Sequence, residues 1–342
     1  MRDLEAALRD MRHRGAVPPV PTAAARPLWS VMIPVFNGAS DLAQSLGSVL
    51  AQDPGPEIMQ IEVVDDCSTA DDPEAVVRAL AGDRVAFYRQ PVNGGHARNF
   101  NSCIARSRGR LVHILHADDW VGTGFYQHMQ DLLAASPEAV MGFCRHTIVG
   151  PDGQTQHVSP LEVEKPGPIP GWLERISGQL RLQPPSVVVR RDVYEDVGGF
   201  DTRMKSCGED WEMWVRLAVL GPVVFEPTPL AFYRDAPASL TKRSVRSGQN
   251  IRDVRRATDI VAGYLPGPTA PALVRRARFS WAEWALYWAW QQVEAGDLRA
   301  GFTALRQAVL CSQDPSVLGR AARIATIGAR RRLRHVWAKP NV

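Results

Sequence analysis

The sequence predicts an α/β fold with a mainly parallel sheet flanked by helices, followed by an α-helical C-terminal extension. Over residues 29–120, short apolar runs alternate with helical patterns of about ten residues, which is typical of β-α-β units. From about residue 245 the chain has a helical pattern rich in Arg, Ala and Trp. With 342 residues, 45% of them hydrophobic, the chain is long enough for one large domain and an extension.

The expected elements follow from these patterns in chain order. Strands are expected over 29–36, 61–66, 84–90, 110–116, 139–149 and 184–191, and helices from about Ser40 and over 72–82, 96–107 and 208–221. Two further helices, joined at 295–297, fit a helical hairpin. The first four strands are separated by helices, and this order favours parallel pairing.

Three parts are predicted along the chain. Residues 1–27 would form an N-terminal helix and a linker rich in Pro and Ala, a composition that extends a chain without giving it a core. Residues 28–243 would form the α/β domain, and residues 244–342 a helical region that ends in a basic tail.

Composition excludes several classes of protein. The net charge of +4, from 40 basic and 36 acidic side chains, is too balanced to indicate nucleic-acid binding. No apolar run approaches the roughly 18 residues of a membrane span, and the charged N-terminus lacks the apolar segment of a signal peptide. The five cysteines contain no C-x-x-C pair, so we expect reduced thiols, no structural zinc and a cytoplasmic protein.

Polar residues follow each of the first four predicted strands. They are Asn37, the pair Asp65 and Asp66, the segment 93–99 and the pair Asp118 and Asp119. In a parallel sheet, ligands bind outside the carboxyl ends of the strands, where the loops are free and helix N-termini present their N–H groups. The sequence therefore predicts a ligand site at this edge.

The adjacent carboxylates of Asp118 and Asp119 require a positive partner, either a metal ion or an arginine, because like charges side by side repel. A divalent cation with oxygen ligands would in turn hold a diphosphate. In the alternative interpretation, Asp118 caps a helix that begins near Gly122.

Seven segments occur in an order that resembles a known family. They are IPVFN (33–37), VVDDCS (63–68), NGGHARN (93–99), HADDW (116–120), GGFD (198–201), GEDWEMWVR (208–216) and YRDAPASLT (233–241). Together they resemble the inverting, nucleotide-sugar-dependent glycosyltransferases of family 2. The resemblance covers roughly residues 29–240 and implies the Rossmann-like GT-A fold.

The resemblance also implies where a nucleotide-sugar donor binds. Asp66 would accept a hydrogen bond from the base, Arg98 and Asn99 would contact the diphosphate and base, and Asp65 would be structural. The implied donor-binding residues are Pro34, Val35, Asn37, Asp66, Asn93, Gly94, Arg98, Asn99 and Asp118. A UDP-sugar is the favoured donor, and a glycan, a lipid-linked saccharide or another hydroxyl compound is the acceptor.

The same resemblance implies a divalent metal, Mn²⁺ or Mg²⁺, held by Asp119 and Asp118. Many relatives read D-x-D-D here, whereas this chain has His116 in place of the first acid. A histidine often follows later in relatives, at a region that here contains Arg234, Ser239 and Lys242.

Catalysis in such a family is a single displacement that needs a general base. The resemblance implies Asp210 as this base, with Glu209 beside it as a like-charged neighbour that favours the protonated form. In the alternative interpretation, both acids only interact with the dipole at a helix start.

Other functions stay open at this point. The implied role is bacterial glycan or glycoconjugate biosynthesis, and the alternatives are an inactive GT-A-like binding or scaffold module and a sugar-phosphate nucleotidylyltransferase. The latter would be expected to carry a G-x-G-x-R loop after the first strand, where this chain reads PVFNGAS. No G-x-G-x-x-G follows that strand either, which disfavours a dehydrogenase.

Two features of the helical region have competing interpretations. Trp281, Trp284, Trp288 and Trp290 lie at near-helical spacing, which favours core or interface packing over a sugar platform. Residues 320–335 contain six arginines and no acid. This segment is either a solvated tail or a basic helix on anionic lipid, which would place the protein peripherally on the cytoplasmic face of the inner membrane.

Overall fold

The computed structural model describes residue 8 and residues 11–21, 26–236 and 240–337. The chain divides into two compact units. The first, here called the sheet unit, comprises Met1–Leu173, Arg181–Thr202 and Met213–Ala236. The second, the helical unit, comprises Glu174–Leu180, Arg203–Glu212 and Pro237–Val342.

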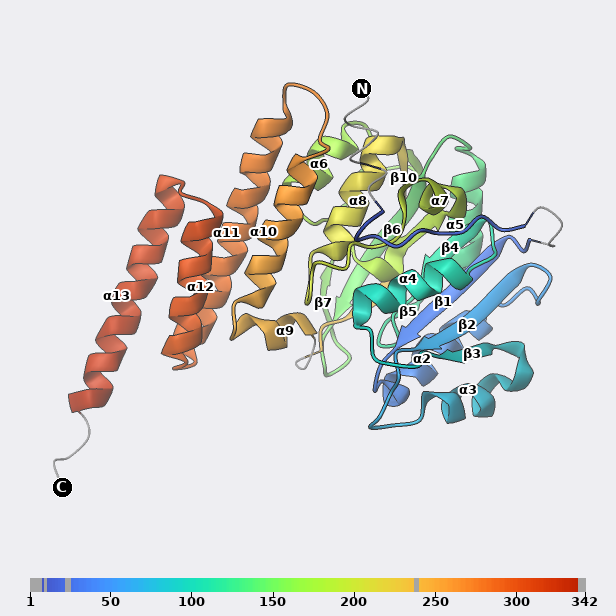
Figure 1. The fold of residues 1–342 in the computed structure, drawn as a ribbon, viewed down its shortest axis with the longest axis horizontal. Coiled ribbons are helices and arrows are strands. Elements are labelled where there is room, and N and C mark those ends of the chain that lie inside the picture. The colour runs from blue at the N-terminus through green and yellow to red at the C-terminus, as the bar shows by residue number, and fades with distance from the viewer. Residues whose placement is uncertain (1–7, 9–10, 22–25, 237–239, 338–342) are drawn as a thin grey trace. The chain divides into compact units, whose positions relative to one another are not determined.

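The sheet unit is built on one mixed sheet with the strand order β3-β2-β1-β4-β9-β6-β10-β5 (Figure 1). Its strands are β1 (Trp29–Val35), β2 (Met59–Asp65), β3 (Ala86–Arg89), β4 (Leu111–Ile114), β5 (Trp120–Val121), β6 (Met141–Val149), β7 (Thr155–Val158), β8 (Gly167–Pro168), β9 (Val187–Arg190) and β10 (Val223–Arg234). The first four strands pair in parallel, as predicted. Strand β9 is antiparallel to both of its neighbours. The predicted α/β fold is confirmed.

Helices connect these strands; those over 172–178 and 191–197 were not predicted, whereas the others begin near predicted positions. They are α2 (Ala39–Leu50), α3 (Pro73–Ala81), α4 (His96–Arg106), α5 (Phe125–Ala134), α6 (Trp172–Gly178), α7 (Arg191–Val197) and α8 (Glu209–Leu220). Helix α3 shows why the sequence begins a helix there: the Asp72 side chain accepts a hydrogen bond from the Ala75 N–H, and Pro73 takes the first helical position.

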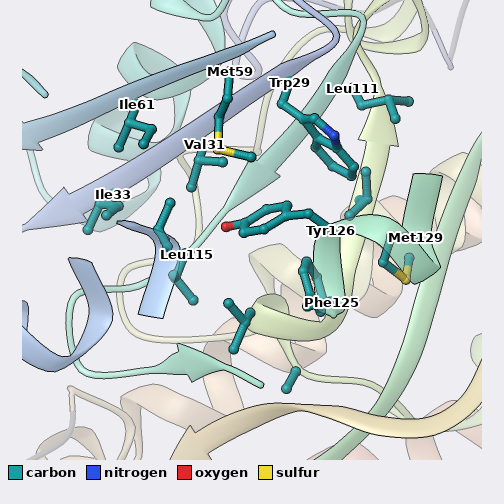
Figure 2. Close-up of a cluster of buried hydrophobic side chains, with 14 of the residues drawn as sticks. Trp29, Val31, Ile33, Met59, Ile61, Leu111, Leu115, Phe125, Tyr126 and Met129 are labelled. Carbon is teal, nitrogen blue, oxygen red and sulfur yellow. The ribbon is translucent and has the colours of Figure 1, made fainter. Parts of the chain in front are cut away.

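The core of the sheet unit forms where α5 and the central strands meet (Figure 2). The rings of Trp29 and Tyr126 pack edge to face, with centroids 5.1 Å apart. Residues of β1, including Val31 and Ile33, are completely buried. This packing places the carboxyl ends of β1, β2 and β4 side by side.

The GGFD segment has a structural reason to contain two glycines. Gly198 has φ +76°, which only glycine adopts without strain. A side chain on Gly199 would lie 2.9 Å from the Arg14 carbonyl oxygen. The buried guanidinium of Arg216 donates to the carbonyl oxygens of this turn, including that of Val197 at 2.7 Å. These hydrogen bonds therefore hold the backbone of the turn in one conformation.

Residues 13–18 belong to the sheet unit and form hydrogen bonds with its later segments. The Gly199 N–H donates to the Gly15 carbonyl oxygen, and Arg191 donates to that of Pro18. Of the helix predicted over 1–14, most residues lie outside the described part of the chain, and residues 11–14 form a turn.

The helical unit contains α9 (Leu240–Val245), α10 (Gln249–Ala262), α11 (Ala270–Glu294), α12 (Leu298–Cys311) and α13 (Pro315–Trp337). Helices α11 and α12 form the predicted hairpin around Gly296, which has φ +84°. Trp281 is buried, as the core interpretation requires, whereas Trp290 is 44% exposed. In the part of the chain that is described, no helix is long and apolar enough to cross a membrane.

Candidate active site

The loop after β1 is tied to the loop after β2 by Asn37. The Asn37 side-chain oxygen accepts hydrogen bonds from the N–H groups of Thr69 and Ala70, at 2.8 and 2.9 Å. Its own N–H donates to Ser68 Oγ, and its φ of +50° is one that asparagine tolerates. The structure thus gives Asn37 a loop-fixing role beside its predicted role in nucleotide binding.

Other predicted residues at the end of β1 lie partly in the core. Pro34 and Val35 are buried strand residues, so only the end of the strand can face a ligand. Between Val35 and Asn37, the ring of Phe36 is 47% exposed. The sequence predicted no role for this ring, yet an exposed aromatic ring at this edge is a flat surface on which a nucleobase can stack.

Asp65, the last residue of β2, and Asp66, which follows it, both have internal partners. The Asp65 carboxylate accepts hydrogen bonds from Ser68 and from Arg89 Nε at 2.7 Å, which agrees with its expected structural role. The two oxygens of Asp66 each accept a backbone N–H, from Gly94 and Gly95, at 2.8 Å. Asp66 therefore holds the glycine segment against the sheet.

The segment 93–99 presents different groups to solvent and to the core. Asn99 is buried and donates to the Val64 carbonyl oxygen at 2.9 Å, so its side chain anchors α4 to β2. Asn93 and Arg98 are exposed. Gly94 lies close to Arg98, since a Cβ on Gly94 would be 3.3 Å from the Arg98 Cβ. Arg98 is thus an exposed cation beside the glycine segment.

Asp119 is the buried member of the second acidic pair. Its Oδ1 accepts the Arg234 N–H at 2.9 Å, while its Oδ2 is buried without a hydrogen-bond partner among the described residues. Burial and the neighbouring Asp118 carboxylate raise the pKa of Asp119 well above its usual range, although Arg234 opposes the shift. Asp118 does not cap α5, whose N-cap is Gly124, so the capping interpretation was wrong.

His116 completes a cluster around this oxygen. Its Nδ1 lies 3.8 Å from Asp119 Oδ2, and potential ligand atoms of His116, Asp118 and Asp119 all lie within 4.8 Å of one another. The His116 ring is stacked on Phe100, with centroids 4.8 Å apart. Carboxylate oxygens and imidazole nitrogens are common ligands of divalent cations in proteins, and the buried Asp119 Oδ2 has no donor among the described residues. The chemistry of this donor set therefore fits a divalent cation, with His116 in place of a carboxylate.

Arg234, at the end of β10, is the positive side chain next to the acidic pair. Its Nε donates to the Asp118 carbonyl oxygen at 3.1 Å and lies 3.7 Å from the Asp41 carboxylate. Its guanidinium lies over the Trp120 ring, 5.0 Å from the centroid. Of the other residues named for this region, Ser239 lies outside the described part of the chain.

Glu209 and Asp210 belong to the helical unit and occupy the first turn of α8. Gly208, just before the helix, has φ +91°. Asp210 Oδ1 accepts the Trp211 N–H at 2.7 Å, and the buried Trp211 indole donates to the Ile176 carbonyl oxygen at 2.7 Å. These contacts fix the start of α8 and leave Asp210 partly exposed.

Two further histidines, His113 and His146, are core residues. Burial lowers the pKa of His113 to about 3 and that of His146 to about 4. Both rings are therefore neutral at physiological pH. All five cysteines are free thiols.

A family model for glycosyl transferase family 2 matches residues 30–213, more than half of the chain. The chain belongs to glycosyl transferase family 2. This glycosyltransferase is 30% identical, over 80% of its length and 86% of the relative's, to an uncharacterized protein of Mycobacterium tuberculosis.

Two solved structures have a similar fold. The fold of the glycosyltransferase resembles Staphylococcus aureus TarS 1–349 in complex with UDP-GlcNAc, with a TM-score of 0.60, 13% identity and coverage of 89% of this chain and 91% of that one. It also resembles the mannosyltransferase PcManGT of Pyrobaculum calidifontis in complex with GDP-Man and Mn²⁺, with a TM-score of 0.56, 19% identity and coverage of 96% and 87%. These likenesses confirm the GT-A fold.

We predict that Asp119→Asn stabilises the metal-free glycosyltransferase and removes its stabilisation by Mn²⁺. The raised pKa means that the native state binds this proton more tightly than the unfolded chain does. Stability is therefore lost as pH rises from the ordinary aspartate pKa to the raised one, and the full cost is present above both.

Thermal unfolding at mildly alkaline pH, with and without Mn²⁺, measures both effects. The melting temperature without metal should rise by about 2 °C or more. At a hundred times its dissociation constant, Mn²⁺ should stabilise the parental protein by about 2.7 kcal/mol and the variant hardly at all. Asp83→Asn, which changes a fully exposed carboxylate, is the control. Equal stabilisation of parent and Asp119→Asn would contradict the metal site.

Proposed function

We propose that the protein is a metal-dependent inverting glycosyltransferase that moves a sugar from a nucleoside-diphosphate sugar to an acceptor hydroxyl, in bacterial glycan or glycoconjugate biosynthesis. The observation that carries the proposal is the cluster of His116, Asp118 and Asp119, in which a buried carboxylate oxygen has no hydrogen-bond donor among the residues that the structure describes. The complexes of TarS with UDP-GlcNAc and of PcManGT with GDP-Man and Mn²⁺ support a nucleotide-sugar donor and a divalent cation.

At the donor site, the proposed roles follow the positions of the side chains. Phe36 and the end of β1 receive the base, and the glycine segment, which Asp66 holds, lets the backbone approach the nucleotide. Arg98 pairs with the diphosphate. Asp119, Asp118 and His116 would hold Mn²⁺ or Mg²⁺, which when bound neutralises charge on the leaving diphosphate. A UDP-sugar remains the favoured donor.

In the transfer itself, we propose that Asp210 is the general base, the group that takes the proton of the acceptor hydroxyl. The acceptor oxygen forms a bond to the anomeric carbon on the face opposite the nucleotide, while the bond to the diphosphate oxygen breaks and its electron pair leaves with the diphosphate. Asp210 takes the hydroxyl proton, and Glu209 beside it contributes to the local negative charge. One displacement inverts the anomeric configuration. The acceptor is a glycan, a lipid-linked saccharide or another hydroxyl compound.

We propose three parts of the chain, with the catalytic domain in the middle: residues 1–27, 28–243 and 244–342. The compact units place 203–212 with the residues that follow Ala236. The segment that carries Asp210 is thus supported by the C-terminal helices.

We predict that Arg98→Ala weakens nucleoside-diphosphate binding about tenfold or more without lowering the melting temperature. A charge-assisted contact is lost, and the exposed side chain holds no element of the fold. Asp66→Ala should weaken binding and also lower the melting temperature, because Gly94 and Gly95 lose their acceptor.

Isothermal titration with the nucleoside diphosphate and Mn²⁺ measures both variants. Arg108→Ala, another exposed arginine, is the control and should bind as the parent does. Unchanged affinity in both Arg98→Ala and Asp66→Ala would remove the donor site from this edge of the sheet.

We predict that Asp210→Asn keeps donor and metal affinity but lowers turnover by about 100-fold or more, because only an interaction of the transition state is lost. The product of the parental enzyme should have the anomeric configuration opposite to that of the donor. Titration, rate measurement and NMR of the product separate these points. Normal turnover of Asp210→Asn would exclude the base assignment, and a retained configuration would exclude single displacement. Donor binding without turnover by the parent would favour the inactive binding module.

A further inference from the structure

The surface formed by α12 and α13 combines exposed apolar side chains with a large excess of positive charge. Phe302 and Leu310 on α12 are 40% and 49% exposed, and Leu318 on α13 is 41% exposed. With Leu305 and Val309 they line a groove between the two helices. Scattered exposed apolar residues are ordinary, but a groove lined by several of them indicates a binding surface.

The charge of these helices is one-sided. Helix α12 contains two arginines, α13 contains six, and neither contains an acidic residue. Since the whole chain carries +4, the rest of the chain is net negative. Arg306 lies in the lining of the groove itself, and Arg323 is exposed on α13. The occupant of this surface must therefore offer both apolar contact and negative charge.

We propose that the α12–α13 surface docks the enzyme on an anionic lipid bilayer, with Phe302, Leu310 and Leu318 in the interface and Arg306 and Arg323 against the headgroups. A nucleic acid would match the charge but not the exposed aliphatic groove, and a second copy of this basic surface would repel it. A basic helix with an apolar face is typical of interfacial binding. The surface extends the basic segment 320–335 to α12.

Vesicle sedimentation of the full chain tests this surface independently of catalysis. The parent should bind phosphatidylcholine vesicles that contain phosphatidylglycerol, bind pure phosphatidylcholine weakly, and dissociate at high salt. Replacing Arg306 and Arg323 by Gln should weaken partitioning by about fivefold for each arginine. The double variant of Phe302→Gln and Leu318→Gln should weaken it about tenfold or more.

The control replaces Arg78 and Leu80, an exposed arginine and an exposed leucine of α3, by Gln and should sediment as the parent does. All variants should keep their activity on a soluble acceptor. Equal binding to neutral and anionic vesicles, or equal binding of the α12–α13 variants and the control, would overturn the proposal. A parental dimer that the Phe302 and Leu318 changes dissociate would assign the surface to a second copy instead.

A second observation concerns α10, which holds the segment that precedes α8. Asp253 on α10 is 1% exposed. Its Oδ2 accepts the N–H groups of Lys205 and Ser206, at 3.0 and 2.8 Å, and the Ser206 hydroxyl at 2.7 Å. Its Oδ1 accepts from Gln249 at 2.8 Å. One buried carboxylate thus binds two successive backbone N–H groups of a segment far away in the sequence.

Further contacts hold the same segment on both sides of Asp210. A Cβ on Gly208 would lie 3.4 Å from the Val254 backbone, so α10 packs directly against this turn. The Tyr264 hydroxyl lies 3.0 Å from the Glu212 carbonyl oxygen and 3.0 Å from its Oε1, and it can donate its hydrogen to either. The start of α8 is therefore fixed by a chain segment that begins more than 35 residues later.

We infer that Asp253 is a positioning residue for the general base, an inference that rests on the proposed role of Asp210. Misplacement of a base costs turnover steeply, because the proton transfer needs hydrogen-bond geometry. The substitution Asp253→Ala should lower kcat about tenfold or more while the affinity for the donor stays unchanged. Asp253→Asn, which keeps one acceptor oxygen, should retain more of the activity.

Asp259→Ala on the same helix is the control, since Asp259 is 65% exposed and contacts Arg278 on the surface. Activity is measured well below each variant's melting temperature, where a purely structural role would leave kcat per folded molecule unchanged. Asp253→Ala and Asp253→Asn with the kcat of Asp259→Ala would overturn the inference. If Asp210→Asn is itself fully active, the base assignment fails, whereas an inactive Asp210→Asn beside an active Asp253→Ala removes only the positioning role.

Discussion

The buried carboxylate of Asp119 is the constraint on which the arrangement of the candidate site in the sheet unit depends. Asp119 lies between β4 and β5, immediately before Trp120, and its burial would be costly without nearby donors or a cation. One donor comes from the backbone of Arg234, because β5 pairs antiparallel with β10 and brings the end of β10 back to this point. The pairing of a two-residue strand thus decides where the acidic cluster lies.

The two aspartate pairs of the chain are similar in sequence but differ in the hydrogen-bond donors that their carboxylates have. The first pair stands at the end of the buried parallel strand β2, which includes Asp65, and the second lies in the loop after the buried parallel strand β4. In the first pair, side chains and glycine N–H groups bind the carboxylates. In the second, Asp119 Oδ2 has no such donor in the described chain. A carboxylate whose oxygens are bonded internally shapes the loop, and one with an oxygen left over is available to a ligand.

Much of the fold could be predicted from the sequence because its signals are local. Apolar periodicity located β1 to β4 and the helices between them, and the helical hairpin around Gly296 was located by its turn. The antiparallel direction of β9 could not be predicted, since a buried run of valines reads the same in either direction. Prediction also missed the contacts of residues 13–18, because they join segments far apart in the chain.

The candidate site was likewise predictable where its residues are close together in the sequence. His116, Asp118 and Asp119 were found because they are adjacent, and the structure adds the Phe100 ring that sets the plane of His116. Asp253 is invisible in the sequence, since nothing about an aspartate in a helix of mixed charge indicates which backbone it will bind. Short-range motifs reveal the groups that meet a ligand, and only the fold reveals the groups that hold them.

The distribution of charge along the chain bears on which ligands the acidic cluster can accommodate. With eight arginines on α12 and α13, the rest of the chain is net negative, so its overall field does not attract a nucleoside diphosphate. Attraction must come from local positive charge, and Arg98 and Arg234 lie near the carboxyl ends of the strands. Two carboxylates beside a diphosphate would repel it unless a cation lies between them. The acidic pair is therefore compatible with an anionic donor when positive charge lies beside it, from Arg234 or from a bound cation. The buried Asp119 Oδ2, which has no donor among the described residues, would be the oxygen that such a cation contacts.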